Sequence, residues 1–475
     1  MAIIKNPLTL VKQEGGGQTT GDYYARVVDY DGTVLKMEWL NNGDEFTMPE
    51  PPTHEGLVFD DWSSSQAITN NKIIIDNNNF IAGPLYHTSS GVHEFDIELT
   101  IITGLTIGFR GMPLTGVNVV INWGDGTSDS VSSNSIIHHT YSDYGTYTIT
   151  YNGAFGDSNN VIIESTWENQ RIIRHIRLSN NFYIYQDIYY MLSLGTAYNL
   201  ETITFPKILD TTKRCSIALY NLYSLNTLIL PINSNPTFGN LIGCENLVIP
   251  YSCIATQNFR IADTNMNNLS RLKYVVLPSS IDYTNVNSSY AISGCPSSIN
   301  FIIPSSFAQT PSYGFSSTAV SNKTLKLSSS LTRWLQTTAF NNLYGQIKTI
   351  DLSNLDLESS YNYISFTSCK SVEKVILPLT LTSLFGGGFS GCINLREVIF
   401  PSTLTELKSG QTFYNCQLAT FDFTRCQQIP TLLGTNVFQN TGSTKILVPS
   451  TLYAQWITET NWVSLVSRII SVTVS

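Results

Sequence analysis

The sequence predicts a mainly β, multidomain chain in which two small β modules precede a long solenoid of stacked coils. Three observations lead to this prediction. A short apolar strand recurs about every 24 residues through the C-terminal part of the chain. Short alternating strands, separated by turns that contain Gly and Asn, fill residues 21–166. Charged residues make up only 13% of the chain, well below the usual quarter, and uncharged polar side chains suit a β-rich surface.

The recurring strand ends in a proline. Because proline has no N–H, it closes a strand at the corner where a solenoid coil must turn. One unit of this size cannot bury enough apolar surface by itself, so the units are expected to stack. The anchors are Pro206, Pro231, Pro250, Pro278, Pro304, Pro378, Pro401 and Pro449, with Ser328, Ser353 and Thr424 in the same place in three further units and Ser179 in a candidate first unit.

The clearest copies lie in residues 369–407. The strand that ends at Pro378 is followed by a Leu- and Thr-rich stretch, by Phe389 and by Cys392, and the pattern then starts again with the strand that ends at Pro401. This array resembles the BspA-like leucine-rich repeats, from about residue 172 to the C-terminus. The resemblance implies a leucine-rich-repeat solenoid over residues 167–475, with cysteines at an inward turn position.

All eight cysteines lie after residue 214, and most stand at the repeat turn. Their spacing is not a zinc pattern, and no CxxC occurs. We therefore expect free, buried thiols rather than disulfides or metal ligands. After the last anchor, the apolar spacing predicts a short helical cap, carried by Leu452, Trp456, Trp462, Leu465 and Ile469.

Residues 21–88 are predicted to form a separate small β module. Residues 24–30 and 33–39 form two strands joined by an Asp-Gly turn at Asp31 and Gly32. The run from Tyr30 to Trp62, with the phrase PTHEGLVFDDW, resembles the internalin-type B repeat. That resemblance implies a β-grasp-like module whose Trp and Phe side chains lie in the core.

Residues 89–166 are predicted to form a second module. Residues 94–102 alternate as a half-buried strand, and residues 117–123 form another that enters the turn Gly124-Asp125-Gly126-Thr127. The phrases WGDGT, HTY and GTYT resemble a PKD domain, which implies a seven-stranded Ig-like sandwich. Calcium needs six to eight oxygens. No full set accompanies Asp125 and Asp129, so we interpret them as turn residues.

The sequence contains no motif for catalysis and none for a cofactor or metal. It lacks a nucleophile elbow, a zinc-protease motif and a phosphate loop. The nearest constellation, His138 and His139 with Asp143, is interpreted as structural. A polysaccharide-cleaving solenoid needs paired acids on one face, whereas Asp351, Asp356 and Glu358 suit turns and edges. We expect a protein that is not an enzyme.

Charge and hydropathy exclude several classes of partner. The net charge of −9 and the absence of a basic tract argue against nucleic acid and anionic membranes. The sequence contains no run of 18 apolar residues, so it predicts no membrane span. Arg171, Arg174 and Arg177 alternate with apolar residues, which favours a solvated strand face over an anion site.

Tyrosines are the better candidates for receptor binding. Exposed Tyr on a rigid scaffold makes large contacts at low entropic cost, and flat rings suit the faces of sugars. The alternative is that these rings pack the solenoid. The candidates are Tyr183, Tyr185, Tyr189 and Tyr190, with Tyr361 and Tyr363 as a second group.

The N-terminal residues 1–20 form a mildly apolar peptide followed by a Gly-rich linker. They are interpreted as an anchoring arm, with a disordered tail as the alternative. The phrase IIKNPLTLVKQEGGG resembles the starts of phage virion and fibre proteins, and it has no long apolar core typical of a secretion signal. The residues assigned to anchoring are Ile3, Ile4, Asn6, Pro7 and Leu8.

Two functions are weighed. The first is a phage virion surface protein, a head or tail fibre or a capsid decoration, whose arm docks on other virion proteins. Its modules would act as a stalk, and its solenoid would bind bacterial surface glycan or protein. The alternative is an adhesin of the BspA or internalin type at the bacterial cell surface. A homo-oligomer is compatible with both, and no heptad run enforces a trimer.

Overall fold

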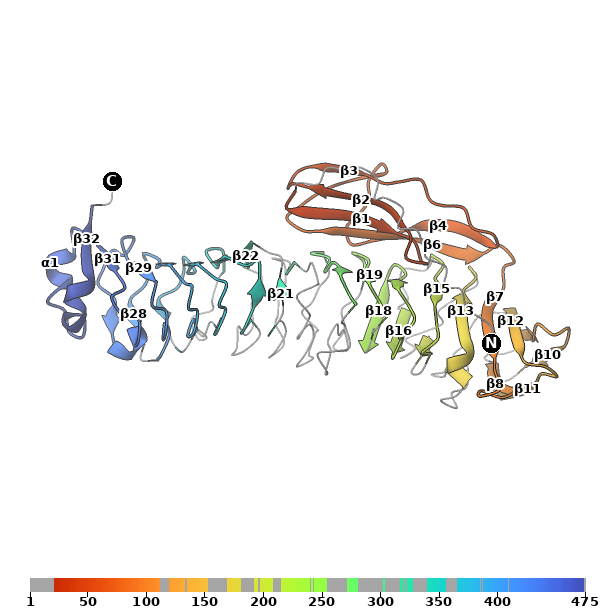
Figure 1. The fold of residues 1–475 in the computed structure, drawn as a ribbon. Coiled ribbons are helices and arrows are strands. Elements are labelled where there is room, and N and C mark those ends of the chain that lie inside the picture. The colour runs from red at the N-terminus through yellow and green to blue at the C-terminus, as the bar shows by residue number, and fades with distance from the viewer. Residues whose placement is uncertain are drawn as a thin grey trace, which may run out of the picture.

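The computed structural model of the chain describes residues 21–111, 119–132, 135–152, 169–180, 192–194, 197–207, 215–239, 241, 243–253, 271–280, 302–303, 317, 319–320, 323–327, 340–355, 365–384, 386, 388–408 and 410–473. The protein is mainly β and elongated (Figure 1). A long solenoid carries a β-sandwich at one end and a helical cap at the other. A further β module lies alongside the half of the solenoid nearest the sandwich.

The N-terminal module contains a mixed four-stranded sheet in the order β2-β1-β6-β4 and a second sheet of two strands. The predicted hairpin is confirmed, since β1 and β2 pair antiparallel and Gly32 lies in the turn with φ +92. The central strands β1 and β6 run parallel. The strands are β1 (Tyr23–Val28), β2 (Val34–Leu40), β3 (Glu45–Thr47), β4 (Leu57–Ser64), β5 (Lys72–Ile74) and β6 (Phe80–Thr88).

The sandwich packs two sheets around Phe95, Phe109 and Trp123, which are buried. The predicted strand near residues 94–102 is confirmed over 93–99 and the one near 117–123 over 119–122, and Gly124 and Gly126 both have positive φ in the turn that follows. The sheets are β10-β9-β12-β7 and β11-β8, built from β7 (His93–Leu99), β8 (Thr106–Gly111), β9 (Val119–Asn122), β10 (Ser128–Val131), β11 (Ser135–Thr140) and β12 (Gly145–Asn152).

One sheet crosses from the sandwich into the solenoid. After η1 (Asn169–Ile172), β13 (Ile173–Arg177) pairs antiparallel with β7 and parallel with β15 (Thr202–Thr204). The strand before Ser179 thus takes the place of the first solenoid strand, as the candidate first unit predicted. Strand β7 takes the place of a preceding coil, so the sandwich closes this end of the solenoid.

The solenoid strands pair parallel and in register, so equivalent residues of successive units lie side by side. The longest sheet has the order β22-β24-β25-β27-β29-β31-β32. The remaining elements are β14 (Leu192–Leu194), β16 (Cys215–Tyr220), β17 (Thr227–Ile229), β18 (Ser234–Gly239), β19 (Asn246–Val248), β20 (Tyr274–Val275), β21 (Ala319–Val320), β22 (Thr324–Lys326), β23 (Tyr344–Gly345), β24 (Thr349–Asp351), β25 (Lys374–Ile376), β26 (Ser383–Leu384), β27 (Glu397–Ile399), β28 (Glu406–Leu407), β29 (Thr420–Asp422), β30 (Thr431–Leu432), η2 (Thr435–Phe438), β31 (Ile446–Pro449), α1 (Tyr453–Trp456), η3 (Val463–Arg468) and β32 (Ile469–Val472).

Phenylalanines stack through the interior of the solenoid. Phe366 and Phe389 lie 5.8 Å apart between ring centroids and nearly parallel, in a column that extends from Phe340 to Phe438. Three of the repeat cysteines, Cys369, Cys392 and Cys416, donate their S–H to a phenylalanine carbonyl of the preceding coil, as Cys392 does to Phe366 O over 3.3 Å. The predicted inward, free thiols are confirmed for the six cysteines whose side chains the structure describes: Cys244, Cys253, Cys369, Cys392, Cys416 and Cys426.

The predicted helical cap is also confirmed. Helix α1 and η3 return the chain beneath the last coil, and Trp456 and Trp462 are fully buried. Trp462 Nε1 donates to Pro430 O over 2.9 Å. The two indoles cover the apolar interior that the last coil would otherwise expose to water.

The predicted module of residues 21–88 has sheets and a core of its own, but it packs against the solenoid rather than standing apart from it. The module lies along the solenoid (Figure 1), and the Tyr86 amide donates to Phe205 O over 3.0 Å. In β1, Ala25 and Val27 belong to the module's own core, whereas Tyr24 and Val28 belong to the solenoid core. The sheet is therefore buried on both faces, which ties the module to the solenoid through apolar packing.

We predict that Gly83→Ala loosens this attachment. A Cβ at Gly83 would lie 2.7 Å from Ile229 Cγ1 and 2.8 Å from Val28 O, so overpacking should cost about 1–3 kcal/mol of unfolding free energy. Chemical unfolding measures the loss. Gly145→Ala is the control, because its Cβ would meet nothing closer than the Tyr147 ring at 3.8 Å. Equal stability of the two variants would contradict close packing at Gly83.

We also predict that the thiols are reduced and protected. Burial raises the pKa of Cys244 and Cys426 to about 12, so little thiolate is present at neutral pH. Of eight cysteines, six are buried, which leaves Cys215 and Cys295. A thiol reagent should label all eight in denaturant without reductant, but at most two quickly in the native protein. Fewer than eight in denaturant would reveal disulfides.

Candidate binding surface

The outward side of the solenoid's strand sheet is a regular surface, which we call the strand face. Its side chains stand two and four residues before each anchor and alternate with buried ones. In β25, Lys374 and Ile376 point outward while Val375 is buried. The parallel register places Lys374 beside Glu397 and Ile376 beside Ile399. Since neighbouring strands lie about 4.8 Å apart, equivalent side chains form continuous rows.

The N-terminal module covers one half of the strand face, over β15, β17, β19 and β20. Arg26 Nε donates to Asn246 Oδ1 over 3.0 Å, and its guanidinium lies 3.9 Å from the centroid of the Tyr274 ring. Tyr24 packs edge-on against the same ring, with centroids 5.5 Å apart. The outward residues buried in this covered half are Thr204, Thr227, Ile229, Asn246, Val248 and Val276.

The other half of the strand face, over β22, β24, β25, β27, β29 and β31, is open among the described residues. Every outward side chain there is exposed or half-buried except Ile399, which is 7% exposed. The set mixes charged, hydroxyl and apolar groups: Thr324, Lys326, Thr349, Asp351, Lys374, Ile376, Glu397, Ile399, Thr420, Asp422, Lys445 and Leu447.

Ion pairs run from coil to coil across the open half. Lys374 Nζ lies 2.7 Å from Glu397 Oε2, and Lys348 Nζ lies 2.7 Å from Glu373 Oε1. The Lys348 hydrogen bond lowers the pKa of Glu373. Exposed pairs of this kind contribute about 0–1 kcal/mol each. They matter less for stability than for the fixed pattern of charge that the open half presents to a partner.

Two acids of the open half also hold turns. Asp351 Oδ1 accepts from the Ser353 amide over 2.9 Å, and Asp422 Oδ1 accepts from the Thr424 amide and hydroxyl at 2.9 and 2.6 Å. The predicted turn role of Asp351 is thereby confirmed. The companion predictions for Asp356 and Glu358 fall outside the described residues.

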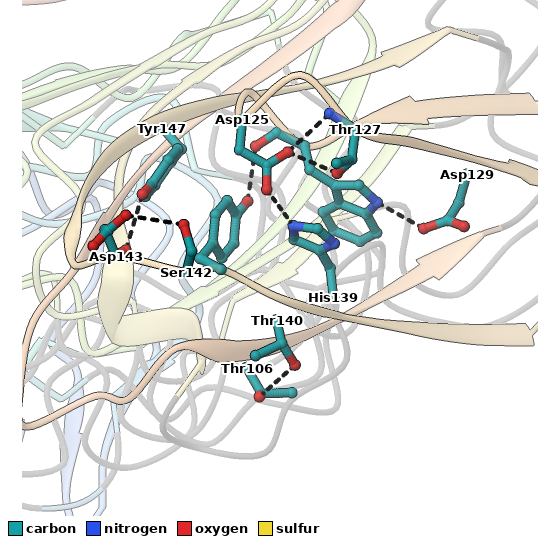
Figure 2. A network of polar contacts seen from close by, with 11 residues as sticks. Thr106, Asp125, Thr127, Asp129, His139, Thr140, Ser142, Asp143 and Tyr147 are labelled. Atoms are coloured by element: carbon teal, nitrogen blue, oxygen red, sulfur yellow. Dashed lines mark hydrogen bonds and ion pairs between the residues drawn. The ribbon is translucent and has the colours of Figure 1, made fainter.

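A polar network closes one end of the sandwich (Figure 2). Asp125 accepts from the Thr127 amide and hydroxyl at 3.0 and 2.6 Å, and its other oxygen lies 2.7 Å from His139 Nε2. The His139 ring stacks on Trp123 with centroids 4.7 Å apart, and Trp123 Nε1 donates to Asp129 over 2.7 Å. Asp125 therefore has the turn role interpreted from the sequence, and Asp129 anchors the core tryptophan.

The constellation of His138, His139 and Asp143 is not assembled for catalysis in the described sandwich. The partner of His139 is Asp125, whereas Asp143 accepts from Ser142 through its carboxylate and from Tyr147 through its backbone. Across the described part of the chain, no group of three or more His, Cys, Asp and Glu side chains is placed to hold a metal ion. The described helices include none of the length and apolarity needed to cross a membrane.

The expected solvated face of Arg174 and Arg177 is instead an ion-paired joint. Both side chains meet the acidic row of β7 where the sandwich sheet joins the solenoid. Arg177 NH1 lies 3.2 Å from Glu94 Oε2, and the same guanidinium also pairs with Asp96. Arg174 pairs with Glu98. These arginines bind the protein's own carboxylates. Burial by itself lowers the pKa of Arg177, but the hydrogen bonds and charges of Asp96 and Glu94 outweigh it and raise that pKa.

Two further His–Asp pairs lie where the module meets the solenoid. His54 Nε2 is 2.7 Å from Asp29 Oδ2, and the ring packs edge-on against Tyr86. His87 Nδ1 is 2.6 Å from Asp60, whose other oxygen accepts from the amide of Lys207 in the solenoid. These pairs orient turns and strands at the joint.

The predicted receptor-binding tyrosines and the predicted anchoring residues lie outside the described residues. What sequence reasoning missed is the division of the strand face. A signal was present in the sequence, because β6 reads FIAGPLYHT and is largely apolar. In the structure, nearly every residue of this strand is buried. Such an apolar run is typical of a strand buried on both faces.

Comparison with known proteins supports the leucine-rich-repeat part of the resemblance. Residues 234–365 and 358–457 match the family model described as BspA type leucine rich repeat region. The chain is also similar to the crystal structure of a leucine-rich repeat protein from Bacteroides ovatus, with 16% identity and a TM-score of 0.36. That similarity covers 74% of this chain and 98% of the other. No curated protein matches the chain. The resemblances to a PKD domain, a B repeat and phage proteins stay predictions.

We predict that ionised Asp125 stabilises its end of the sandwich. The hydrogen bonds from Thr127, with His139, lower the pKa of Asp125 from 3.8 to about 2. A lowered pKa means that this stability is present above pH 3.8 and is lost as the pH falls through about 2. Asp125→Asn should speed hydrogen exchange in residues 119–131 roughly fivefold at neutral pH, and the difference should vanish near pH 2.

Asp143→Asn is the matched control, since its carboxylate bonds only to a neighbouring hydroxyl at the same end. It should leave exchange in residues 119–131 unchanged at every pH. An Asp125→Asn effect that persists undiminished at pH 2 would assign the stabilisation to shape rather than charge.

Proposed function

We propose that this chain is a non-enzymatic, adhesin-like binding protein that attaches to its partner through the open half of the strand face. The observation that carries the proposal is the division of that face. The covered half already binds a folded module, with Arg26 and Tyr24 seated on Asn246 and Tyr274. The open half has the same strand geometry and register, and its outward side chains have no folded partner among the described residues.

The chemistry of the open half suits recognition rather than catalysis. Ile376 and Ile399 form an apolar centre beside the Lys374–Glu397 ion pair, with Thr349 and Thr420 on the strands to either side. A buried apolar centre with a polar rim is typical of protein-binding surfaces. Hydroxyl and charged rows also suit a surface glycan. We propose bacterial surface protein or glycan as the partner class.

The similarity to BspA-type repeats favours the adhesin over the virion hypothesis. Repeats of this type suggest a surface or adhesin-like protein, and we propose the cell surface as its location. The virion hypothesis depends on residues 1–20, which lie outside the described residues, and the comparisons give it no support. A fold by itself does not fix a function, so the proposal depends on a binding test.

The test uses arginines to block the open half. The purified chain, coated on beads, is offered to a panel of bacterial cells, surface proteins and glycans. Thr349→Arg with Thr420→Arg adds bulk on both sides of the Lys374–Glu397 pair, next to the Ile376–Ile399 centre. Neither threonine hydroxyl makes a hydrogen bond to another described residue. We expect at least a tenfold loss of binding, because the added side chains exclude a closely packed partner.

Thr382→Arg with Thr431→Arg is the control, which adds the same charge at two exposed positions of the shorter sheet β26-β28-β30, one just before β26 and one in β30. It should bind within twofold of the unmodified chain, and melting temperatures check that both variants fold. Absence of binding by the unmodified chain to every surface would overturn the adhesin-like function. Binding that survives in the open-half variant would overturn only the choice of surface.

A further inference from the structure

The last strand of the long sheet has one unpaired edge among the described residues. Strand β32 pairs parallel with β31 from Ile469 to Val472 and ends the sheet order. It lies at the cap end of the solenoid, away from the module and the sandwich (Figure 1). Its free edge therefore faces along the solenoid axis.

The repeat geometry fixes where the backbone groups of β32 point. In each coil, the residue just before the anchor donates its N–H to the next coil, as Leu377 does to Ile399 O at 3.1 Å and Phe423 to Leu447 O at 2.9 Å. Ser471 holds this position in β32, because it pairs with Val448. Its N–H thus points away from β31, toward the place of a following coil.

Two outer strands at the other end of the protein carry charges that discourage pairing with another chain. Strand β2 has Lys36 and Glu38, and β10 has Asp129. Strand β32 reads Ile-Ile-Ser-Val and has none. The preceding Arg468 does not shield it, since Arg468 Nε donates to Thr444 O over 2.9 Å and is thereby directed at the coil before.

The same end of the solenoid exposes apolar side chains. Val463 and Val466, three residues apart on η3, are 59% and 37% exposed, and Ile470 on β32 is 40% exposed. Terminal coils ordinarily present a polar outer face to water. This end departs from that rule by combining an apolar surface with an unshielded strand edge, which is the combination expected of an interface.

We propose that the cap end binds the same end of a second copy, with the two β32 strands antiparallel about a two-fold axis. A two-fold contact is self-complementary. The backbone N–H and C=O groups of Ile469 and Ser471 that point away from β31 in one copy therefore meet the same backbone groups in the other copy. The long sheet then continues from one molecule into the next. Val463 and Val466 pack beside the joint. The inference is independent of the proposed function, although a dimer would display two open halves and bind by avidity.

Sedimentation velocity over a concentration series tests the proposal. The unmodified chain, whose mass is 52.8 kDa, should sediment at twice that mass at about 100 µM and dissociate on dilution. Ser471→Pro removes an N–H that faces away from β31, a site where an edge strand tolerates proline. It should weaken dimerisation at least tenfold with an unchanged melting temperature. Val463→Lys with Val466→Lys should do the same without altering the backbone.

Leu418→Lys is the control, because Leu418 is 53% exposed in a turn away from the cap, and it should leave the dimer intact. A chain that stays monomeric through about 100 µM would overturn the proposal. So would a dimer that persists in both the Ser471→Pro and the lysine variants, because its interface would then lie elsewhere. If Ser471→Pro fails to fold, the lysine variant alone decides.

Discussion

The structure depends on one constraint, which is that no coil of the solenoid can stand alone. Each coil has an apolar interior and two hydrogen-bonding edges, and both must be covered by a neighbour. Through most of the solenoid the neighbour is another coil, and the phenylalanine column and the S–H donors of the cysteines repeat from one to the next. At the two ends of the solenoid, elements other than coils cover the apolar interior. Strand β7 of the sandwich pairs with β13, and buried Trp456 and Trp462 close the other end.

The same constraint explains why the two N-terminal modules pack against the solenoid. The sandwich supplies a strand that the first coil needs, and the Arg177 pairs with Glu94 and Asp96 fix its position. The N-terminal module has a two-sided sheet, with Val27 facing its own core and Val28 facing the solenoid. Detaching it would expose the Ile229 and Val248 rows to water, at about 25 cal/mol per Å² of apolar surface. The three parts therefore form one continuous body around a shared core.

In this arrangement, some surfaces hold the parts of the protein together and others are open to a binding partner. His54, His87 and His139 each pair with an aspartate at a joint or turn, so these histidines hold the fold together. Among the described residues, the second half of the strand face and the cap end remain open. The first is flat, regular and mixed in charge, which favours recognition of an extended partner. The second is small, apolar and self-complementary in its backbone, which favours a copy of itself.

The sequence alone determined the repeating strand, the buried positions on either side of Ile376, the inward cysteines and the Trp cap, because each follows from local periodicity and from which side chains avoid water. The turn that contains Asp125 could also be predicted from the sequence. Only the tertiary structure decided which half of the strand face is covered. The approach of Gly83 to Ile229 joins residues far apart in the chain, and no local pattern specifies such a pair. The outward apolar residues Val248 and Ile376 occupy the same place in the repeat, and the position of the module buries Val248 and leaves Ile376 half-buried in the open half.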